Sequence, residues 1–284
     1  MTLDLDRYRI APGAEVRLAD RSTDDDQGWD EDAAEDATEA LLERADDLQE
    51  RLYADGQQSL LVVLQAMDAA GKDSTIRSVF GPLNPQGVRV TSFKAPSKLE
   101  LSHDFLWRVH RAVPRRGEIG VFNRSHYEDV LIVKVHGWAS PETIERRYEH
   151  IAAFERLIAD SGTRVLKIML HISPDYQLER FRRRLERSDK HWKFNPEDLD
   201  ERKHWPAYME AFETAIARTS TDAAPWVVVP AETRWFRDLV VARLLVDTLT
   251  AMDPQYPAPT FDAAEYTPAR LDDAAVIPGW PLSP

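Results

Sequence analysis

The stretch LLVVLQAMDAAGKDS, residues 60–74, decides the fold predicted for this chain. It begins with a continuous apolar run, which is typical of a β-strand buried on both faces. The run passes through a short loop into a helix that is expected to start near Gly71. Strand, loop and helix in this order are the context of a phosphate-binding loop, whose pattern is G-x-x-x-x-G-K-[ST]. The chain departs from that pattern twice, since Ala66 replaces the first glycine and Asp73 replaces the hydroxyl residue.

The loop and the start of its helix can bind phosphate through the backbone. N–H groups at a helix start point outward, and the helix dipole adds roughly half a positive charge there. Lys72 adds a mobile full charge. A Gly-Lys pair after a strand also arises by chance, so the loop motif alone does not settle its function. The predicted phosphate-binding residues of the loop are Ala69, Ala70, Gly71, Lys72, Asp73 and Ser74.

Asp68 puts a carboxylate inside a loop that should attract anions. A carboxylate beside a phosphate repels it unless a cation lies between them or the carboxyl group takes a proton. We therefore interpret Asp68 as a Mg²⁺ ligand, as a base or orienting group for an attacking phosphate oxygen, or as both. For Asp73 two interpretations stay open. It replaces the metal-binding hydroxyl, or it is a first-turn acid that favours the helix dipole.

A second group of polar residues follows the strand predicted at residues 117–124. This strand is expected to lie beside the strand of the loop, and open α/β sheets bind ligands at the carboxyl ends of their strands. Arg124 is predicted to grip phosphate there, with Asn123 beside it, and Glu128 is predicted to hold a metal ion. The alternative is that Asn123 and Arg124 bind no ligand and only cap the backbone.

Basic residues concentrate between Arg180 and Lys203. Leu178, Phe181 and Leu185 form the apolar stripe of a predicted helix, which leaves four arginines on the opposite face. That face is either solvated or handles an anion. Arginine forks match phosphate oxygens, and a lid over phosphates would exclude water from a transfer. The predicted lid residues are Arg180, Arg183, Arg184, Arg187, Lys190 and Lys193.

Apolar runs and helical patterns alternate along the chain. Strands are predicted at residues 59–67, 87–93, 117–124, 164–173 and 225–231. Helices are predicted at residues 37–55, 71–83, 97–113, 140–162, 173–188, 206–220 and 234–252. Strands that alternate with long helices imply right-handed crossovers and a parallel sheet with helices on both faces. We predict one three-layer α/β domain.

The predicted domain covers residues 37–252. Residues 1–36 are interpreted as an arm with an acidic loop. Residues 253–284 are interpreted as a Pro-rich tail that wraps the surface or is partly disordered.

The composition of the 284-residue chain narrows the classes of function. The chain has no cysteine, which excludes a disulfide framework and thiolate metal sites. No apolar run is long enough for a membrane span and no signal peptide is readable, so a cytoplasmic protein is expected. A formal net charge of −13 argues against a general nucleic-acid binder, which needs a broad basic surface.

Three motifs, DAAGKDS, FNRSHYEDV and SDKHWKFNPEDLDERKHW, closely resemble those of family-2 polyphosphate kinases, and the resemblance covers about residues 5–255. The changes at Ala66 and Asp73 are themselves family-like. The resemblance implies a thymidylate-kinase-like P-loop fold with a helical lid at about residues 180–206. It also implies reversible, Mg²⁺-dependent transfer of phosphate between inorganic polyphosphate and nucleotides, with Mn²⁺ as a substitute metal.

The resemblance further implies roles for single residues. Asn123 and Glu128 match a third subgroup that phosphorylates both AMP and ADP, whereas the restricted subgroups carry Asp and Asn at these positions. Asp68 and Glu128 are expected to hold the metal. Asp129 is expected to be functional, and Arg234 falls where relatives often have Lys. A homo-oligomer, either a dimer or a tetramer, is expected. The expected catalytic residues are Asp68, Lys72, Arg124 and Arg184.

These observations give one hypothesis and two rivals. The hypothesis is a phosphotransferase that moves phosphate from polyphosphate to AMP and ADP, giving ADP and ATP. The rivals are an ATP-dependent nucleoside or nucleotide kinase and a non-catalytic regulator that binds polyphosphate or nucleotides. Trp192, Trp205 and Tyr208 either stack on a purine base or pack in the core.

Overall fold

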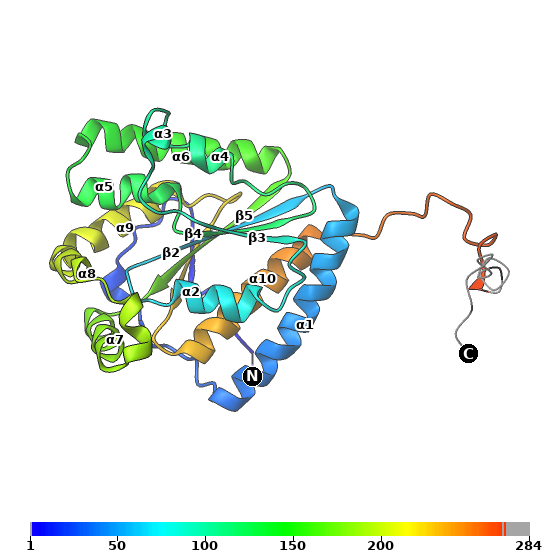
Figure 1. Ribbon diagram of the computed structural model, residues 1–284, viewed down its shortest axis with the longest axis horizontal. Helices are drawn as coiled ribbons and strands as arrows, with labels where there is room; N and C mark the ends of the chain where they lie inside the picture. Colours follow the sequence, from blue (N-terminus) through cyan, green and yellow to red (C-terminus); the bar gives the residue numbers. More distant parts are fainter. Residues whose placement is uncertain (1, 269, 271–284) are drawn as a thin grey trace.

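The computed structural model describes residues 2–268 and 270. Within these residues the chain forms one six-stranded sheet with the order β1-β6-β5-β2-β4-β3 (Figure 1). The five strands from β6 to β3 run parallel, and the short β1 pairs antiparallel to β6. The strands are β1 (Arg9–Ile10), β2 (Ser59–Ala66), β3 (Val88–Ser92), β4 (Ile119–Asn123), β5 (Thr163–His171) and β6 (Trp226–Pro230).

Strand β2, which leads into the phosphate-binding loop, lies in the middle of the sheet. It pairs with β4 on one side and with β5 on the other, and all of its residues are buried. Leu64 lies opposite Asn123 and Ala66 opposite Leu170, so the loop and the turn after β4 leave the sheet at the same edge. The predicted adjacency of these two strands is confirmed.

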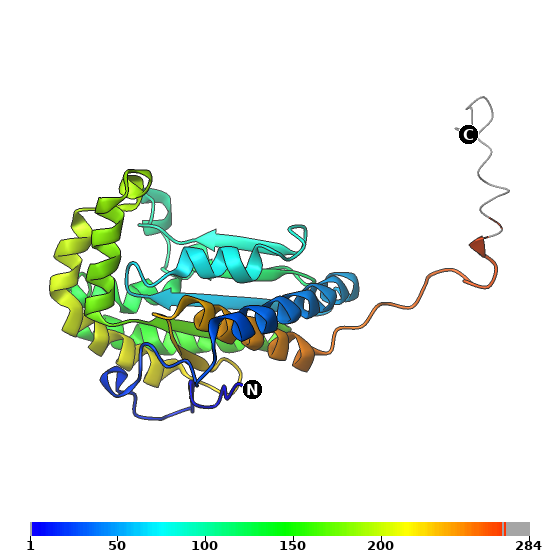
Figure 2. The same cartoon turned by 90° about the horizontal axis from the view of Figure 1, so that it is seen from below.

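Helices cover both faces of the sheet (Figures 1 and 2). One layer contains α1 (Glu31–Asp55), α2 (Lys72–Thr75) and α10 (Arg234–Met252), and α1 packs along α10. The other contains α3 (Lys98–Leu101), α4 (Trp107–His110), α5 (Ile132–Val135), α6 (Pro141–Asp160) and α9 (Trp205–Thr219). The predicted three-layer α/β fold is therefore confirmed.

The segment between β5 and α9 stands at the carboxyl end of the strands. It consists of α7 (Pro174–Glu186), α8 (Glu197–Glu201) and two 3-10 turns, Ser188–Lys193 and Arg202–His204. Further 3-10 turns lie at Leu18–Asp20 and His126–Val130. Among the described residues no helix is both long and apolar enough to cross a bilayer.

Several helices differ from their predictions. Helix α1 starts at Glu31 instead of residue 37, because Asp30 caps it by accepting the Ala33 N–H at 3.0 Å. Several acids assigned to a loop therefore lie in the first turns of a helix, where acids favour the dipole. The helix predicted at residues 97–113 is two single turns, separated where Asp104 accepts the Leu106 N–H at 2.9 Å. Helix α2 widens into a π turn at Ile76–Phe80.

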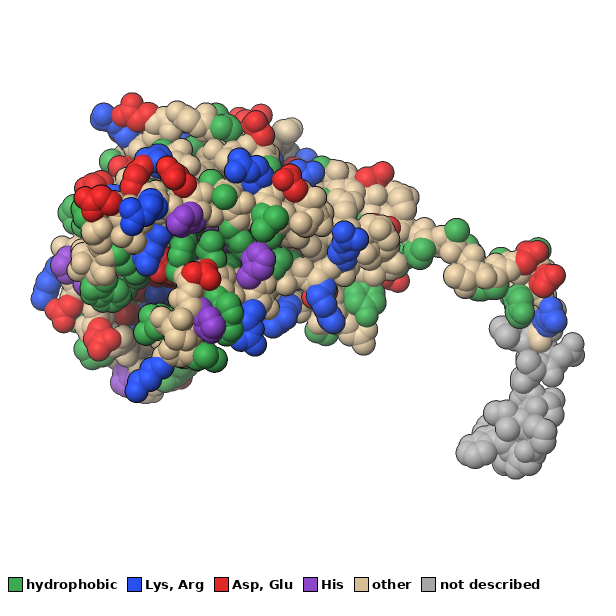
Figure 3. Space-filling model, turned by 90° about the horizontal axis from the view of Figure 1, so that it is seen from above, with side chains coloured by type: hydrophobic (Ala, Val, Ile, Leu, Met, Phe, Trp, Pro, Cys, Tyr) green, Lys and Arg blue, Asp and Glu red, His purple; other side chains and the backbone are tan. Residues whose placement is uncertain are grey.

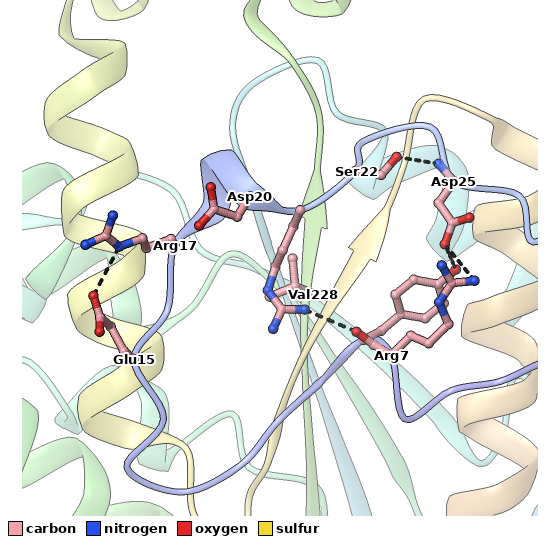
Figure 4. Close-up of a pocket in the computed structure, with 9 residues that line it drawn as sticks. Arg7, Glu15, Arg17, Asp20, Ser22, Asp25 and Val228 are labelled. Carbon is pink, nitrogen blue, oxygen red and sulfur yellow. Dashed lines mark hydrogen bonds and ion pairs between the residues drawn. The ribbon is translucent and has the colours of Figure 1, made fainter.

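The arm before α1 lies against the β6 edge of the sheet (Figure 2). The Val228 N–H donates to the Tyr8 carbonyl at 2.9 Å, and the Tyr8 hydroxyl donates to Asp25 at 2.8 Å. A cavity of about 620 Å³ opens between these residues (Figure 4). Two of its arginines form local ion pairs, Arg7 with Asp25 at 3.5 Å and Arg17 with Glu15 at 3.1 Å, and the third, Arg21, donates to the Arg7 carbonyl at 3.2 Å.

The described part of the tail leaves the body of the domain. Residues 257–268 are exposed and extend outward, so this part does not follow the first of the two predicted alternatives, a tail that wraps the surface (Figure 1). The rest of the predicted tail, residues 269 and 271–284, lies outside the described residues.

A fully buried ion pair lies under the turn that follows β4. Lys167 Nζ contacts Glu155 Oε2 at 2.6 Å and the Thr219 carbonyl at 2.6 Å. The Tyr127 hydroxyl donates to Glu155 at 2.7 Å, and His126 lies 3.2 Å from the same carboxylate. Lys167 and its neighbours hold the pKa of the Glu155 carboxyl below its usual range. The network anchors the turn between Arg124 and Glu128.

Replacing one partner of this pair should destabilise the protein. Glu155→Gln leaves the Lys167 ammonium buried without a carboxylate, so we expect a loss of about 3–5 kcal/mol in the free energy of unfolding. Urea unfolding followed by circular dichroism measures it. Glu145→Gln, at an exposed pair with Arg218, is the matched control and should change little. A loss below about 1 kcal/mol for Glu155→Gln would contradict this assignment.

Candidate active site

A cavity of about 940 Å³ lies at the carboxyl ends of β2, β3 and β4, under α7. It collects residues from the phosphate-binding loop, the ends of two neighbouring strands and the lid segment. The lining residues are Asp68, Ala69, Gly71, Lys72, Asp73, Ser74, Ser92, Phe93, Lys94, Ala95, Asn123, Arg124, Arg180, Arg183, Arg184, Arg187, Lys190, Trp192, Lys193 and Arg234.

The predicted phosphate-binding residues come together here, with one exception in the loop. Ala70 is buried and does not line the cavity, and its N–H points back to the Met67 carbonyl at 3.4 Å. Contact between Ala70 and phosphate stays a prediction, and the buried position of Ala70 does not support it. The tight turn of the loop directs this amide inward.

The loop contains two residues with left-handed backbone. Gly71 has φ of 107°, and a side chain there would collide with the Arg237 guanidinium. Ala69 has φ of 66°, a conformation that costs a residue with a side chain of order 1 kcal/mol or more. Such strain persists only where the surroundings impose it, and it is concentrated at functional sites. Arg124, after β4, is a further case with φ of 61°.

Lys72 folds back over the loop. Its ammonium donates to the Ala66 carbonyl at 2.9 Å and to the Met67 carbonyl at 3.4 Å. The side chain is buried, and burial together with the nearby Arg124 charge lowers its pKa. The ammonium is thus held inside the loop by neutral carbonyls, which makes it available to an anion that enters.

Asp68, Arg124 and Glu128 form a chain of charges between the loop and the turn after β4. Arg124 Nη2 lies 2.5 Å from Asp68 Oδ1, and Arg124 Nη1 lies 3.7 Å from Glu128 Oε2. Burial raises the pKa of the Glu128 carboxyl, against the opposing effect of Arg124. The Arg124 guanidinium therefore separates two carboxylates at the edge of the cavity.

Asp73 turns away from the backbone of its own helix. Its Oδ1 accepts a hydrogen bond from Asn123 Nδ2 at 2.7 Å, which joins the phosphate-binding helix to the end of β4. An aspartate at position 123 would set two carboxylates against each other at this distance. The amide of Asn123 removes that repulsion.

The lid cations differ in how well acids compensate them. Arg183 pairs with Glu179 at 2.8 Å, Arg184 with Asp198 at 3.5 Å, and Arg187 and Lys190 share Asp189. Arg180 is different, because burial and the nearby Arg234, Arg183 and Arg184 charges lower its pKa. Arginines that crowd one side of a cavity favour a bound polyanion.

Comparisons with known proteins agree with this arrangement. The family model described as Polyphosphate kinase 2 (PPK2) matches residues 28–257. The chain belongs to the polyphosphate kinase 2 family. It is 49% identical over 255 residues to an AMP/ADP-polyphosphate phosphotransferase of Meiothermus ruber, covering 89% of this chain and 96% of the relative. The resemblance seen in the sequence motifs is thereby confirmed.

Two further relatives cover nearly the whole chain. An ADP-polyphosphate phosphotransferase of Rhodopseudomonas palustris is 39% identical, over 95% of this chain and 96% of the relative. The crystal structure of polyphosphate kinase 2 from Arthrobacter aurescens superposes with a TM-score of 0.89 at 42% identity and covers 95% of both chains.

The carboxylates of this family member suit a Mg²⁺ ion. Mg²⁺ in phosphotransferases is held by one or two carboxylates together with substrate phosphates rather than by a cage of protein groups. Asp68 and Glu128 provide two carboxylates on the two sides of Arg124. Among the described residues, no three His, Cys, Asp or Glu side chains are grouped as a metal site. Asp129 lies elsewhere and pairs with Arg147 at 3.3 Å.

Sequence analysis missed several residues of the cavity. They lie at the carboxyl end of β3, the edge strand, where the rule that ligands bind at the carboxyl ends of parallel strands would have found them. These residues are Ser92, Phe93, Lys94 and Ala95. Arg234, which the sequence motifs had already singled out, lies at the start of α10 and also lines the cavity.

The three aromatic residues that were left open fall in three different places. Trp192 lines the cavity and is 77% exposed. Tyr208 lines a second chamber of about 200 Å³, which shares Asp68 and Arg124 with the cavity. Trp205 packs against the core.

The crowding around Arg180 predicts opposite effects on stability and on anion binding. Arg180→Gln removes one of the repelling charges, so we expect the free energy of unfolding to rise by about 0.5–1 kcal/mol. Inorganic pyrophosphate should then raise the melting temperature of the variant less than that of the native protein. Differential scanning fluorimetry with and without pyrophosphate measures both effects. Arg243→Gln, at an exposed pair with Asp247, is the control. A variant that is less stable but equally stabilised by pyrophosphate would contradict the interpretation.

Proposed function

We propose that the chain transfers phosphate reversibly between inorganic polyphosphate and the nucleotides AMP and ADP. The observation that carries the proposal is the position of Asp68 and Arg124. They lie where the arginine-lined cavity, which suits a polyanion, meets the smaller second chamber. The name of the 49% identical relative, AMP/ADP-polyphosphate phosphotransferase, supports the same substrates.

The donor phosphate occupies the phosphate-binding loop in this proposal. Backbone amides at the start of α2 face it, and Lys72 exchanges its carbonyl partners for phosphate oxygens. The rest of the polyphosphate follows the lid cations. Bidentate arginine–phosphate pairs are the strong form of this contact, so Arg180, Arg183 and Arg187 hold the chain along α7. Lys190 and Lys193 extend the same row.

The acceptor's terminal phosphate oxygen attacks in line, oriented by Asp68. Phosphoryl transfer has a loose transition state, so the protein contributes positioning and charge neutralisation. Arg124 and Arg184 neutralise charge that develops on the transferring group and the bridging oxygen. An arginine in such a role is worth about 10³ to 10⁵ in rate in other phosphotransferases. A Mg²⁺ ion, for which Mn²⁺ is a substitute, would be held by Asp68 and Glu128 and would neutralise phosphate oxygens.

The acceptor range of the proposal includes both AMP and ADP. It is supported by Asn123 and Glu128, which match the subgroup with both activities, and by the hydrogen bond that Asn123 makes to Asp73. We propose a cytoplasmic reaction, because nucleotides are available there. The net charge of −13 makes nucleic acid an unsuitable partner.

One assay tests the donor and the acceptor together. The purified protein is given AMP, ADP, GMP or GDP with polyphosphate and Mg²⁺, and products are separated by chromatography. We expect AMP to give ADP and ADP to give ATP. Efficient phosphorylation of AMP or a nucleoside by ATP, without turnover of polyphosphate, would instead identify an ATP-dependent kinase. Calorimetric binding of polyphosphate without any product would identify a regulator.

Two substitutions test the proposed catalytic groups. Asp68→Asn removes the orienting carboxylate and Lys72→Ala removes the mobile cation. Each should therefore lower kcat at least 100-fold, about 2.7 kcal/mol of transition-state stabilisation. Steady-state kinetics measures the loss, and circular dichroism checks that both variants fold. The control is Asp222→Asn, an exposed aspartate outside the cavity. Native-like turnover by Asp68→Asn would remove that residue from the mechanism.

We further propose a homo-oligomer, a dimer or a tetramer, assembled through α6. A groove of about 900 Å³ lies over α4 and α6, and apolar and His side chains gather on this face (Figure 3). Exposed Arg146, Ala153 and Asp160 recur at heptad spacing on α6, which puts them on one face of the helix. Two copies of α6 that cross antiparallel at Ala153 would pair each Arg146 with the Asp160 of the other copy.

Disrupting this face should produce monomers. Leu157 lines the groove and is 54% exposed, so Leu157→Arg buries a charge in the proposed interface without disturbing the core. We expect light scattering after size exclusion to show the mass of one chain for this variant and a multiple of it for the native protein. A native protein that is monomeric would contradict the assembly. An oligomer unaffected by Leu157→Arg would locate the interface elsewhere.

A further inference from the structure

A buried arginine lies on the side of the phosphate-binding loop opposite the cavity. Arg237 is in the first turns of α10, is 1% exposed, and is not among the residues that line the cavity. A charged group is rarely buried to this extent unless it is paired. Its position directly behind the loop raises the question of what its charge does there.

The guanidinium occupies the space under Gly71. A Cβ at position 71 would collide with Arg237 Nη1 and would lie 3.4 Å from Cζ. Gly71 is also the loop residue with φ of 107°, which L-residues with side chains rarely adopt. Arg237 and Gly71 are therefore matched in shape. Because Gly71 has no side chain, there is room for the Arg237 guanidinium next to it.

The remaining nitrogens of the guanidinium are held on its far side. Nε and Nη2 both contact Asp238 Oδ1, at 2.9 and 2.8 Å. Asp238 Oδ2 accepts a hydrogen bond from the Ser78 hydroxyl at 2.8 Å, which ties α10 to the turn that follows α2. The pair thus forms a fixed dipole with its positive end, Nη1, toward the loop and its negative end away from it.

We propose that Arg237 is a positioning residue that prepares the loop to bind the donor phosphate. It supports the left-handed turn at Gly71 from behind and adds a positive potential of the same sign as the helix dipole of α2. A low-dielectric interior weakens this potential much less than water would. Arg237 does not touch the substrate, so its effect reaches the anion through the loop. The inference rests on the proposed function, because it concerns the polyphosphate site.

A double substitution separates this role from a merely structural one. Arg237→Met/Asp238→Asn removes the dipole without leaving an unpaired buried carboxylate. We expect the Kd for polyphosphate of defined chain length, measured by isothermal titration calorimetry, to rise at least tenfold. The KM for ADP should stay within twofold. A residue with only a packing role would lower the melting temperature and leave the Kd for polyphosphate unchanged.

A pair on the same helix provides the matched control. Arg243 and Asp247 form an exposed ion pair at 2.8 Å on α10, so Arg243→Met/Asp247→Asn makes the same chemical change far from the loop. This variant should keep the native Kd and KM. Arg237→Lys keeps a cation behind the loop but loses the guanidinium nitrogens that contact Asp238. Its Kd for polyphosphate should therefore lie between those of the native protein and the double variant. If the double variant does not fold, Arg237→Lys carries the test, with an expected rise of about threefold in Kd.

The outcomes distinguish this inference from the proposed function. Native protein that does not bind polyphosphate would overturn the proposed function. Native protein that binds polyphosphate, together with a folded variant that binds it equally tightly, would overturn the role of Arg237 alone. An equal loss of affinity for polyphosphate and for ADP would also overturn it, because the proposed effect is confined to the donor loop.

Discussion

The ion pair between Arg124 and Asp68 is the interaction around which the site is arranged. It joins the ends of β4 and β2 across 2.5 Å, and it puts a guanidinium between two carboxylates that would otherwise repel each other and any phosphate beside them. Further cations surround this pair. Lys72 lies inside the loop and the lid arginines line the cavity on the side of α7, whereas Arg237 lies behind the loop and outside the cavity. A polyanion would therefore meet cations on several sides, although the whole chain is acidic.

The side chains of the motif that supplies Arg124 point in two directions. Asn123, Arg124 and Glu128 face the ligand cavities, whereas His126 and Tyr127 turn inward to the buried pair of Glu155 and Lys167. Arg124 has a left-handed backbone, which costs free energy and needs support from its surroundings. The buried network anchors the turn three residues further on, because the Tyr127 hydroxyl contacts both Thr219 and Lys167.

The lid and the loop show how stability and ligand binding oppose each other. Arg180 has other arginines as neighbours, so the protein without its ligand carries an unfavourable repulsion there. A bound anion would be attracted by the same group of arginines and would offset the repulsion between them. Strain at Ala69 and Arg124 follows the same logic, since residues held in costly conformations are concentrated where a ligand is to be bound. Sites of this kind reduce stability in exchange for affinity.

The sequence by itself determined the parts of this protein that depend on local pattern. The alternation of apolar runs and helices indicated a parallel sheet with helices on both faces. The loop motif placed Lys72 at a helix start, and the spacing of Arg180, Arg183 and Arg184 placed them on one face of α7. Arg187, predicted on the same face, lies beyond the end of the helix at Glu186, where the backbone is extended. These inferences hold because strand burial, helix periodicity and loop chemistry are encoded within a few neighbouring residues.

Only the tertiary structure decided which distant groups meet. Nothing in the local sequence places Arg237 behind Gly71, joins Asn123 to Asp73, or buries Lys167 against Glu155. It also took the folded chain to show that Ala70 faces inward. The physical reason is that such contacts arise from strand order and helix packing across the whole domain. A residue's neighbours along the chain do not specify them.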